Sequence, residues 1–170
     1  MGLLSWRSPK LPAAVRAAMQ IARSERVLAA AVLARGRGHV ALTTTGLHVA
    51  LSGDAPLNVA WDHVAHASWE DPMLVAVVDV DGQQLRISLE LNEPGMVPVV
   101  LRERVTSTVV WECHRVLADG LGARFIARRA VGTGPVRWAV VFDDGVAADN
   151  PALRAAADAV LAELRADLGL

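Results

Sequence analysis

The sequence predicts an α+β protein with antiparallel strands, and three observations support this class. The expected elements follow the order helix, about seven short strands, helix, three strands, helix. No strand–helix alternation repeats along the chain, as a parallel sheet would require. Of the 170 residues, 53% are apolar and the formal net charge is −1, a composition far from that of disordered chains. We therefore expect residues 1–170 to fold as a single compact unit.

The first elements are a helix and a hairpin. A helix is expected over residues 11–22, where Pro12 suits the first turn and apolar residues recur at every third or fourth position. Residues 27–33 are then continuously apolar, residues 35–38 are typical of a glycine turn, and residues 39–42 resume an apolar run. The two runs predict a β-hairpin.

Further short strands are expected after this hairpin. Residues 47–51 alternate in polarity after a threonine-rich bend that ends at Gly46. Residues 73–80 and 83–91 flank Asp81-Gly82, the strongest hairpin signal in the chain. Before that hairpin, residues 58–69 predict one or two strands, with a shared face formed by Trp61, His63, Ala65, Ala67 and Trp69.

A second helix is expected over residues 98–111, where apolar residues recur at helical spacing. The β-branched residues of 105–111 would also fit a strand. A last helix is expected from Asn150-Pro151, because asparagine is a good N-cap and proline suits the first helical position. Apolar residues continue from there at helical spacing to Leu168.

Between these two helices the sequence predicts a three-stranded meander. Its strands are expected at residues 113–118, 123–129 and 136–142, separated by glycine-containing turns. The alternative to a single unit is therefore a division into residues 24–111, with the first strands and a helix, and residues 112–170, with the meander and the last helix.

Two neighbouring stretches carry a family resemblance. Residues 40–49, Val-Ala-Leu-Thr-Thr-Thr-Gly-Leu-His-Val, form an apolar strand, a threonine-rich bend with glycine, and a second strand. Residues 58–64, Asn-Val-Ala-Trp-Asp-His-Val, form a strand that ends in aspartate before a branched apolar residue. Over residues 26–111 this pattern resembles bacterial members of the pleckstrin-homology-like superfamily. The resemblance implies an antiparallel barrel of about seven strands capped by a helix, and it carries no catalytic residues. The arginine-rich composition is also similar to that of small proteins of high-GC bacteria.

Composition bears on the compartment. Cys113 is the single cysteine, which excludes an intramolecular disulfide and fits a reducing environment. The first residues lack the apolar core of a signal peptide, and no apolar run approaches the roughly 20 residues that span a bilayer. We expect a cytoplasmic protein. The basic N-terminal segment, with Arg7 and Lys10 near Leu3, Leu4 and Trp6, would allow at most peripheral membrane contact.

Motifs for catalysis, metals and cofactors are missing from the sequence. No serine lies in Gly-x-Ser-x-Gly, the glycine pairs lack the context of a phosphate-binding loop, and the Asp-Gly turns lack the bidentate glutamate of a calcium loop. We therefore expect no catalytic residue, no metal and no cofactor. The alternative is a small enzyme whose site is assembled from distant residues, for which the candidates are Asp62, His63, His66, Glu70 and Arg86.

The meander offers one candidate binding surface. Apolar residues alternate there with arginines, which predicts one core face and one charged face. The charged face would bind an acidic protein segment or a phosphate-bearing ligand, and its members are Arg115, Arg124, Arg128 and Arg137. The alternative is a solvated sheet face without a ligand. In either case, changing Arg124 and Arg128 to Glu is predicted to leave folding nearly intact.

The leading functional hypothesis is a non-catalytic binding or scaffold module. Its partner would be a protein or a second copy of the chain, recognised through a strand edge or a loop face. Nucleic acid is disfavoured because Trp138 alternates to the face opposite Arg137, so that no stacking platform lies among the arginines.

Overall fold

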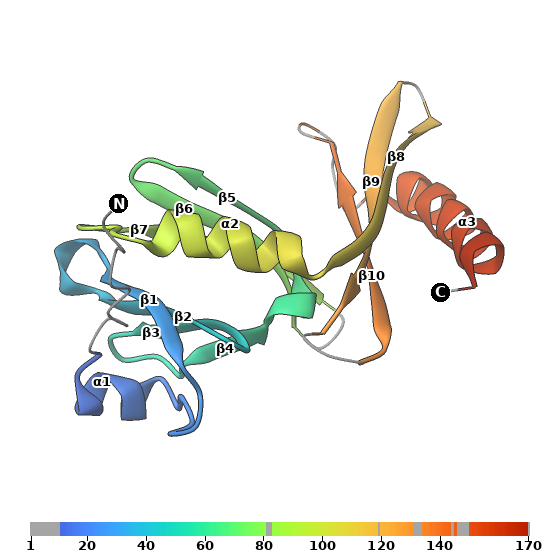
Figure 1. Cartoon of the computed structure of the whole chain (residues 1–170). Helices are drawn as coiled ribbons and strands as arrows, with labels where there is room; N and C mark the ends of the chain where they lie inside the picture. Colours follow the sequence, from blue (N-terminus) through green and yellow to red (C-terminus); the bar gives the residue numbers. More distant parts are fainter. Residues whose placement is uncertain are drawn as a thin grey trace, which may run out of the picture. The chain divides into compact units, whose positions relative to one another are not determined.

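The computed structural model describes residues 11–80, 83–118, 120–130, 134–143, 145 and 150–169. Within these residues the chain is an α+β protein with ten antiparallel strands in three sheets and three α-helices (Figure 1). Contacts divide it into two units, Met1–Ser107 and Thr108–Leu170.

The first unit begins with a short helix and a four-stranded sheet. The helix α1 (Ala13–Ala18) precedes strands that pair in the order β1-β2-β3-β4, each antiparallel to its neighbour. Their bounds are β1 (Val27–Val32), β2 (Gly38–Thr43), β3 (Gly46–Leu51) and β4 (Leu57–Ala60). Gly46 is required at the start of β3, because a Cβ there would lie 2.3 Å from the backbone oxygen of Val59 on β4.

The first unit continues with a three-stranded sheet and a helix. The strands β5 (Val64–Glu70), β6 (Met73–Val80) and β7 (Gln83–Glu90) pair antiparallel in the order β5-β6-β7. Helix α2 (Val97–Ser107) follows. Helix α2 is buried on one side. Its buried residues recur at helical spacing and so share one face: Val97, Val100, Leu101 and Val105.

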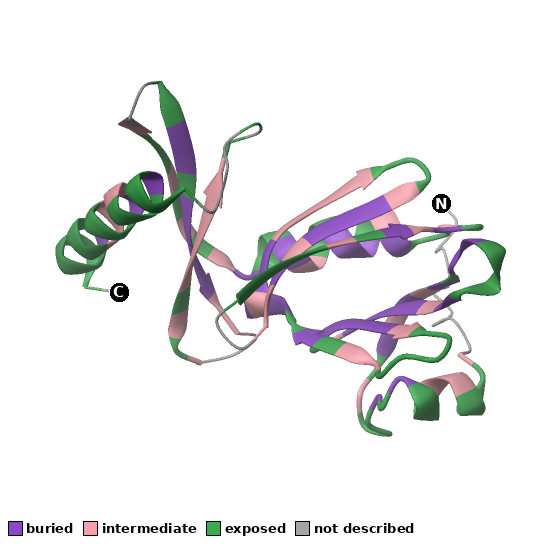
Figure 2. Ribbon diagram, turned by 180° about the vertical axis from the view of Figure 1, so that it is seen from behind, coloured by how far each residue is buried: buried purple, intermediate pink, exposed green. Residues whose placement is uncertain are grey.

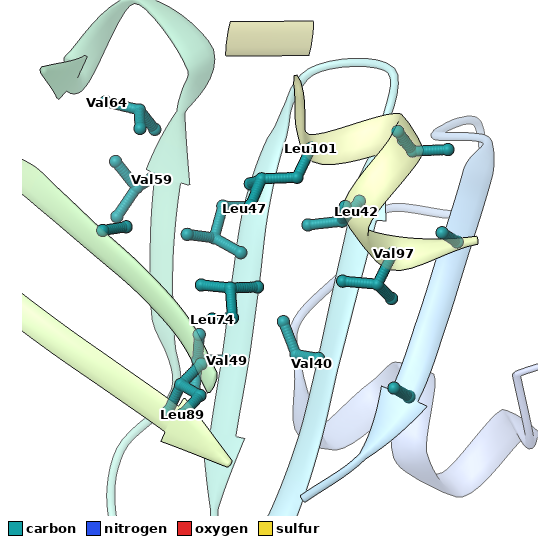
Figure 3. Packing of buried hydrophobic residues seen from close by; sticks show 14 of the residues in the cluster. Val40, Leu42, Leu47, Val49, Val59, Val64, Leu74, Leu89, Val97 and Leu101 are labelled. Carbon is teal, nitrogen blue, oxygen red and sulfur yellow. The ribbon is translucent and has the colours of Figure 1, made fainter. Parts of the chain in front are cut away.

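One core joins both sheets and α2 of this unit. Figure 3 shows side chains from β2, β3 and α2 that point toward those of β6 and β7, among them Val40, Leu47, Leu74 and Leu101. Strand β2 is buried on both faces, since Val40 and Leu42 point into this core while Ala41 belongs to a second cluster with Met19, Ile21 and Val27. The segment after α1 therefore covers the outer face of the four-stranded sheet.

The second unit is a three-stranded sheet with one helix on it. The strands β8 (Val109–Ala118), β9 (Leu121–Arg129) and β10 (Val136–Phe142) pair antiparallel in the order β10-β9-β8. Helix α3 (Pro151–Leu168) packs Ala157 and Leu164 against Ala123 and Phe125 of β9. Buried residues follow β9 along its length in Figure 2. The expected meander and final helix are confirmed.

Three expected elements have different bounds. The helix expected over 98–111 ends at Ser107, and β8 begins at Val109, because the β-branched residues there pair with β9 instead of continuing the helix. The helix expected over 11–22 spans only Ala13–Ala18, and the chain leaves the helical region at Gln20, whose φ is 55°. Sequence periodicity alone could not place these ends.

The remaining differences concern residues 58–69 and the barrel. Trp61–His63 form a 3₁₀ turn between β4 and β5, so Trp61 and His63 do not share a strand face with Ala65. The indole Nε1 of Trp61 donates to the backbone oxygen of Thr43 at 3.0 Å, which fixes the turn against β2. The described strands lie in separate sheets, none of which closes into a barrel.

Candidate functional site

A concave surface of the first unit lies along α2 and reaches β5. Two adjacent hollows, with volumes of about 440 and about 520 Å³, share Val99 and Arg102 as lining residues. The first is lined by Ala67, Ser68, Trp69, Pro98, Val99, Leu101 and Arg102, and the second by Val99, Arg102, Glu103, Thr106 and Ser107. We call this surface the β5–α2 groove.

Strand β5 gives the groove an unpaired edge. It is the outer strand of its sheet, and among the described strands it pairs only with β6. An edge strand presents a row of backbone N–H and C=O groups that can pair with another extended chain. The groove therefore combines backbone hydrogen-bonding capacity on one side with side chains of α2 on the other.

The groove is lined by both apolar and charged side chains. Val99 is 54% exposed, although it is a large hydrophobic residue on a helix that buries four others. Arg102 lies in both hollows, and within the described part of the chain its side chain makes no hydrogen bond or ion pair, whereas Arg104 pairs with Glu103 at 2.8 Å. The groove therefore offers an apolar contact next to an unpaired positive charge.

A polar network on the outer face of the four-stranded sheet is the second feature of the first unit. The carboxylate of Glu25 accepts hydrogen bonds from the hydroxyls of Thr43 and Thr45 and from Nε2 of His48 at 2.9 Å. The other imidazole nitrogen of His48 lies 2.8 Å from the amide oxygen of Asn58. The imidazole of His48 is therefore held on both sides, by Glu25 at Nε2 and by Asn58 at Nδ1.

This network fixes the charge of Glu25. Burial acts to raise the pKa of Glu25. The hydrogen bonds from Thr43, Thr45 and His48 and the charge of His48 together lower it by more, so the net pKa is lowered from 4.5. Arg16 donates to the backbone oxygen of Glu25 and to that of Ala22. These bonds hold the segment after α1 in place against β2 and β3.

The four arginines proposed from the sequence do not share one face. Arg137 pairs with Arg128 across β10 and β9, and Arg124 lies on the same side of β9. Arg115 pairs instead with Ala123, which is buried under α3, so Arg115 lies on the helix-covered face of the sheet. The register brings three of the arginines together and separates the fourth.

Arg128 is a structural residue of the second unit. It is only 3% exposed, and its Nη1 donates to the hydroxyl of Thr108 at 2.7 Å. Burial lowers the pKa of Arg128 to about 10, against the raising effect of the nearby charge of Glu112. Because Arg128 is buried, we no longer expect the chain to fold normally when Arg128 is changed to Glu. Arg124 is exposed, so the expectation is kept for Arg124.

A histidine–aspartate pair lies beside these arginines on the same sheet face. Nε2 of His114 on β8 lies 3.0 Å from each carboxylate oxygen of Asp143, just after β10. The two side chains meet above Gly122 on β9, where a Cβ would lie 2.6 Å from His114 Nε2 and 2.7 Å from Asp143 Oδ2. Sequence reasoning missed this pair because its members are 29 residues apart.

The residues considered for an assembled enzyme site are spread over the second sheet. Asp62 and His63 lie in the 3₁₀ turn before β5, with 3.9 Å between His63 Nε2 and Asp62 Oδ2, and Glu70 lies at the far end of β5. His66 and Arg86 stand in one row across β6, since both pair with Val77. The described residues contain no group of three possible metal ligands.

Comparison with protein-family models, with curated proteins and with solved structures finds no match to this chain. Within the described residues, none of the helices is both long and apolar enough to cross a membrane. The basic N-terminal residues Arg7 and Lys10, considered for peripheral membrane contact, lie outside the described residues.

Proposed function

We propose that residues 1–107 form a non-catalytic binding module of the pleckstrin-homology-like kind, and that the β5–α2 groove takes an extended segment of a partner protein. The observation that carries the proposal is the unpaired edge of β5 beside the exposed Val99 and Arg102 of α2. The proposal also takes up the family resemblance of residues 26–111, whose described part forms a four-stranded sheet, a three-stranded sheet and a helix that shares their core.

The chemistry of the groove defines the segment. An added strand would hydrogen-bond to the backbone of β5 and place every second side chain toward α2. Next to Val99 and Trp69 the groove favours an apolar side chain, because burial of apolar area drives association. Next to Arg102 it favours a carboxylate. The expected ligand is therefore an extended peptide with an acidic residue near an apolar one.

Selection from a display library of random peptides against the full chain tests this function. We expect selected peptides to share an acidic residue near an apolar one, and to shift the backbone NMR signals of β5 in particular. Binding should weaken as salt is raised, because the pair with Arg102 is exposed to solvent.

Two matched pairs of variants locate the binding. V99D and R102E change the groove, while L85D and R86E make the same changes at exposed positions of β7 in the same unit. We expect the groove variants to weaken peptide binding about tenfold or more and the β7 variants to leave it unchanged. Failure to select any peptide, or selection of peptides that bind V99D and R102E as well as the original chain, would overturn the proposal.

A further inference from the structure

We propose that β8 is a self-association surface, through which two copies of this chain join their three-stranded sheets edge to edge in antiparallel register about Cys113. The proposal concerns the second unit and does not depend on the β5–α2 groove. It follows from the position of β8 in its sheet and from the order of side chains along it.

Strand β8 is a long outer strand. It spans Val109–Ala118, pairs with β9 on one side, and among the described strands has no neighbour on the other. Its regular pairing with β9 runs from Trp111 to Val116, between two register shifts. Edge strands of globular proteins are usually short, bulged or charged to prevent pairing. Here the register shifts restrict the regular part of the edge to six residues.

The side chains of β8 are self-complementary around Cys113. In an antiparallel pair of identical strands centred on one residue, positions equally far before and after the centre face each other. One position away are Glu112 and His114, and two positions away are Trp111 and Arg115. The first pair matches an acid with a base, and the second matches an aromatic ring with a guanidinium.

The third pair of positions is apolar and unusually exposed. Val110 is 45% exposed and Val116 is 66% exposed. The value of Val116 is the highest among the large exposed hydrophobic residues of the described chain. In the register about Cys113 they face each other at both ends of the interface, with Val110 at the first register shift of β8 and Val116 just before the second. Pairing would remove both side chains from water, whereas they are exposed in the single chain.

The orientation of His114 is fixed by its neighbours on the same sheet face. Asp143 holds Nε2 of His114, and the missing side chain of Gly122 provides the space for this contact. Within the described residues Nδ1 of His114 has no hydrogen-bond partner. In the register about Cys113 this oriented imidazole faces Glu112 of the second copy.

Sedimentation of the full chain over a wide concentration range tests the proposal. We expect the original chain to form a species of twice its 18.0 kDa mass, and V116K to dissociate it with a dissociation constant at least about tenfold higher. Twofold symmetry places each substitution in the interface twice. The matched control is L85K, because Leu85 is an exposed hydrophobic residue on β7, the outer strand of another sheet, and this variant should dimerise normally.

A charge rescue tests the register itself. V110E alone and V116K alone should both weaken the dimer, while the double variant V110E/V116K should restore it, because the new carboxylate of one copy then faces the new ammonium group of the other. Within one chain these two positions are about 20 Å apart along the strand, so their side chains cannot pair. If V116K does not fold by circular dichroism, V110K takes its place in the dissociation test.

Three results would overturn the proposal. The first is a chain that remains a monomer at every concentration. The second is a dimer that V116K and V110K leave intact, which would place the interface elsewhere. The third is a double variant that stays dissociated although each single variant folds, which would exclude pairing about Cys113.

Discussion

Nε2 of His48 lies 2.9 Å from Oε1 of Glu25, across 23 residues of sequence, and this ion pair fastens the segment after α1 to β3. Both side chains are largely buried, with 8% and 11% of their surface exposed. A buried charge is stable only with a partner, so the two residues depend on each other.

The first prediction concerns the pH dependence of stability. The pKa of Glu25 is lowered in the folded chain, so its charge stabilises the fold above the ordinary value of 4.5, and this contribution is lost as pH falls through the lowered folded value. We expect the free energy of unfolding to fall more steeply below pH 4.5 for the original chain than for E25Q. Urea unfolding of both proteins over this pH range measures the difference.

At neutral pH, E25Q should be less stable than the original chain by about 2 kcal/mol, because hydrogen bonds to a charged group are worth about that much. The control is E70Q, at the exposed end of β5. Equal pH dependence of E25Q and the original chain would contradict the role of Glu25.

The second prediction separates two neighbouring arginines of β9. R128E places a negative charge in a site that is 3% exposed and beside Glu112, so it should lower the free energy of unfolding by about 3 to 5 kcal/mol. R124E, at an exposed position on the same sheet face, should cost less than about 0.5 kcal/mol. Thermal and urea unfolding compare them, and similar losses for both would show that burial is not the cause.

The third prediction concerns Gly122. G122A introduces a Cβ within 2.7 Å of both His114 and Asp143, so the two side chains must separate. The loss of stability should stay below about 1 kcal/mol, because the pair is solvent-exposed. A double-mutant cycle with H114A and D143A should give a coupling energy in the original chain and none in G122A. An unchanged coupling energy would mean that the pair moves aside intact.

The fourth prediction concerns the start of α3. The side chain of Asn150 accepts hydrogen bonds from the backbone N–H groups of Ala152 and Leu153. N150A should lower the free energy of unfolding of the second unit by about 1 kcal/mol, while N150D should retain most of it. Unfolding followed by near-UV circular dichroism, to which the edge-to-face pair Trp111 and Trp138 of this unit contributes, reports the change. Equal loss in N150D would exclude capping as the cause.

Local signals predicted the elements that they control by themselves. Asn150-Pro151 placed the start of α3 correctly, and the turn residues placed the β1–β2 and β6–β7 pairs. The boundary at Ser107 was not predictable, because the apolar spacing of 98–111 fits a helix and its β-branched residues fit a strand. Pairing with β9, a contact distant in sequence, decides between them.

The residues that form the candidate sites are brought together almost entirely by contacts distant in sequence, so most of them could not be predicted. Alternation correctly grouped Arg124, Arg128 and Arg137, but the face of Arg115 depends on the register of β8 against β9. Val99 and Arg102 look like ordinary surface residues of a helix, and only the neighbouring edge of β5 makes them part of a groove. The Glu25 network has no spacing signal, since its members come from separate strands and a loop.

The two-sided cover of β2 has a kinetic consequence. Amide hydrogens exchange with solvent only when a local opening exposes them, and the rarest openings are those that require several layers to separate. Val40, Ala41 and Leu42 are each 0% exposed, between the shared core on one side and the segment after α1 on the other. Their amides should therefore be the slowest of the first unit to exchange for deuterium, and their exchange rates would report its global unfolding.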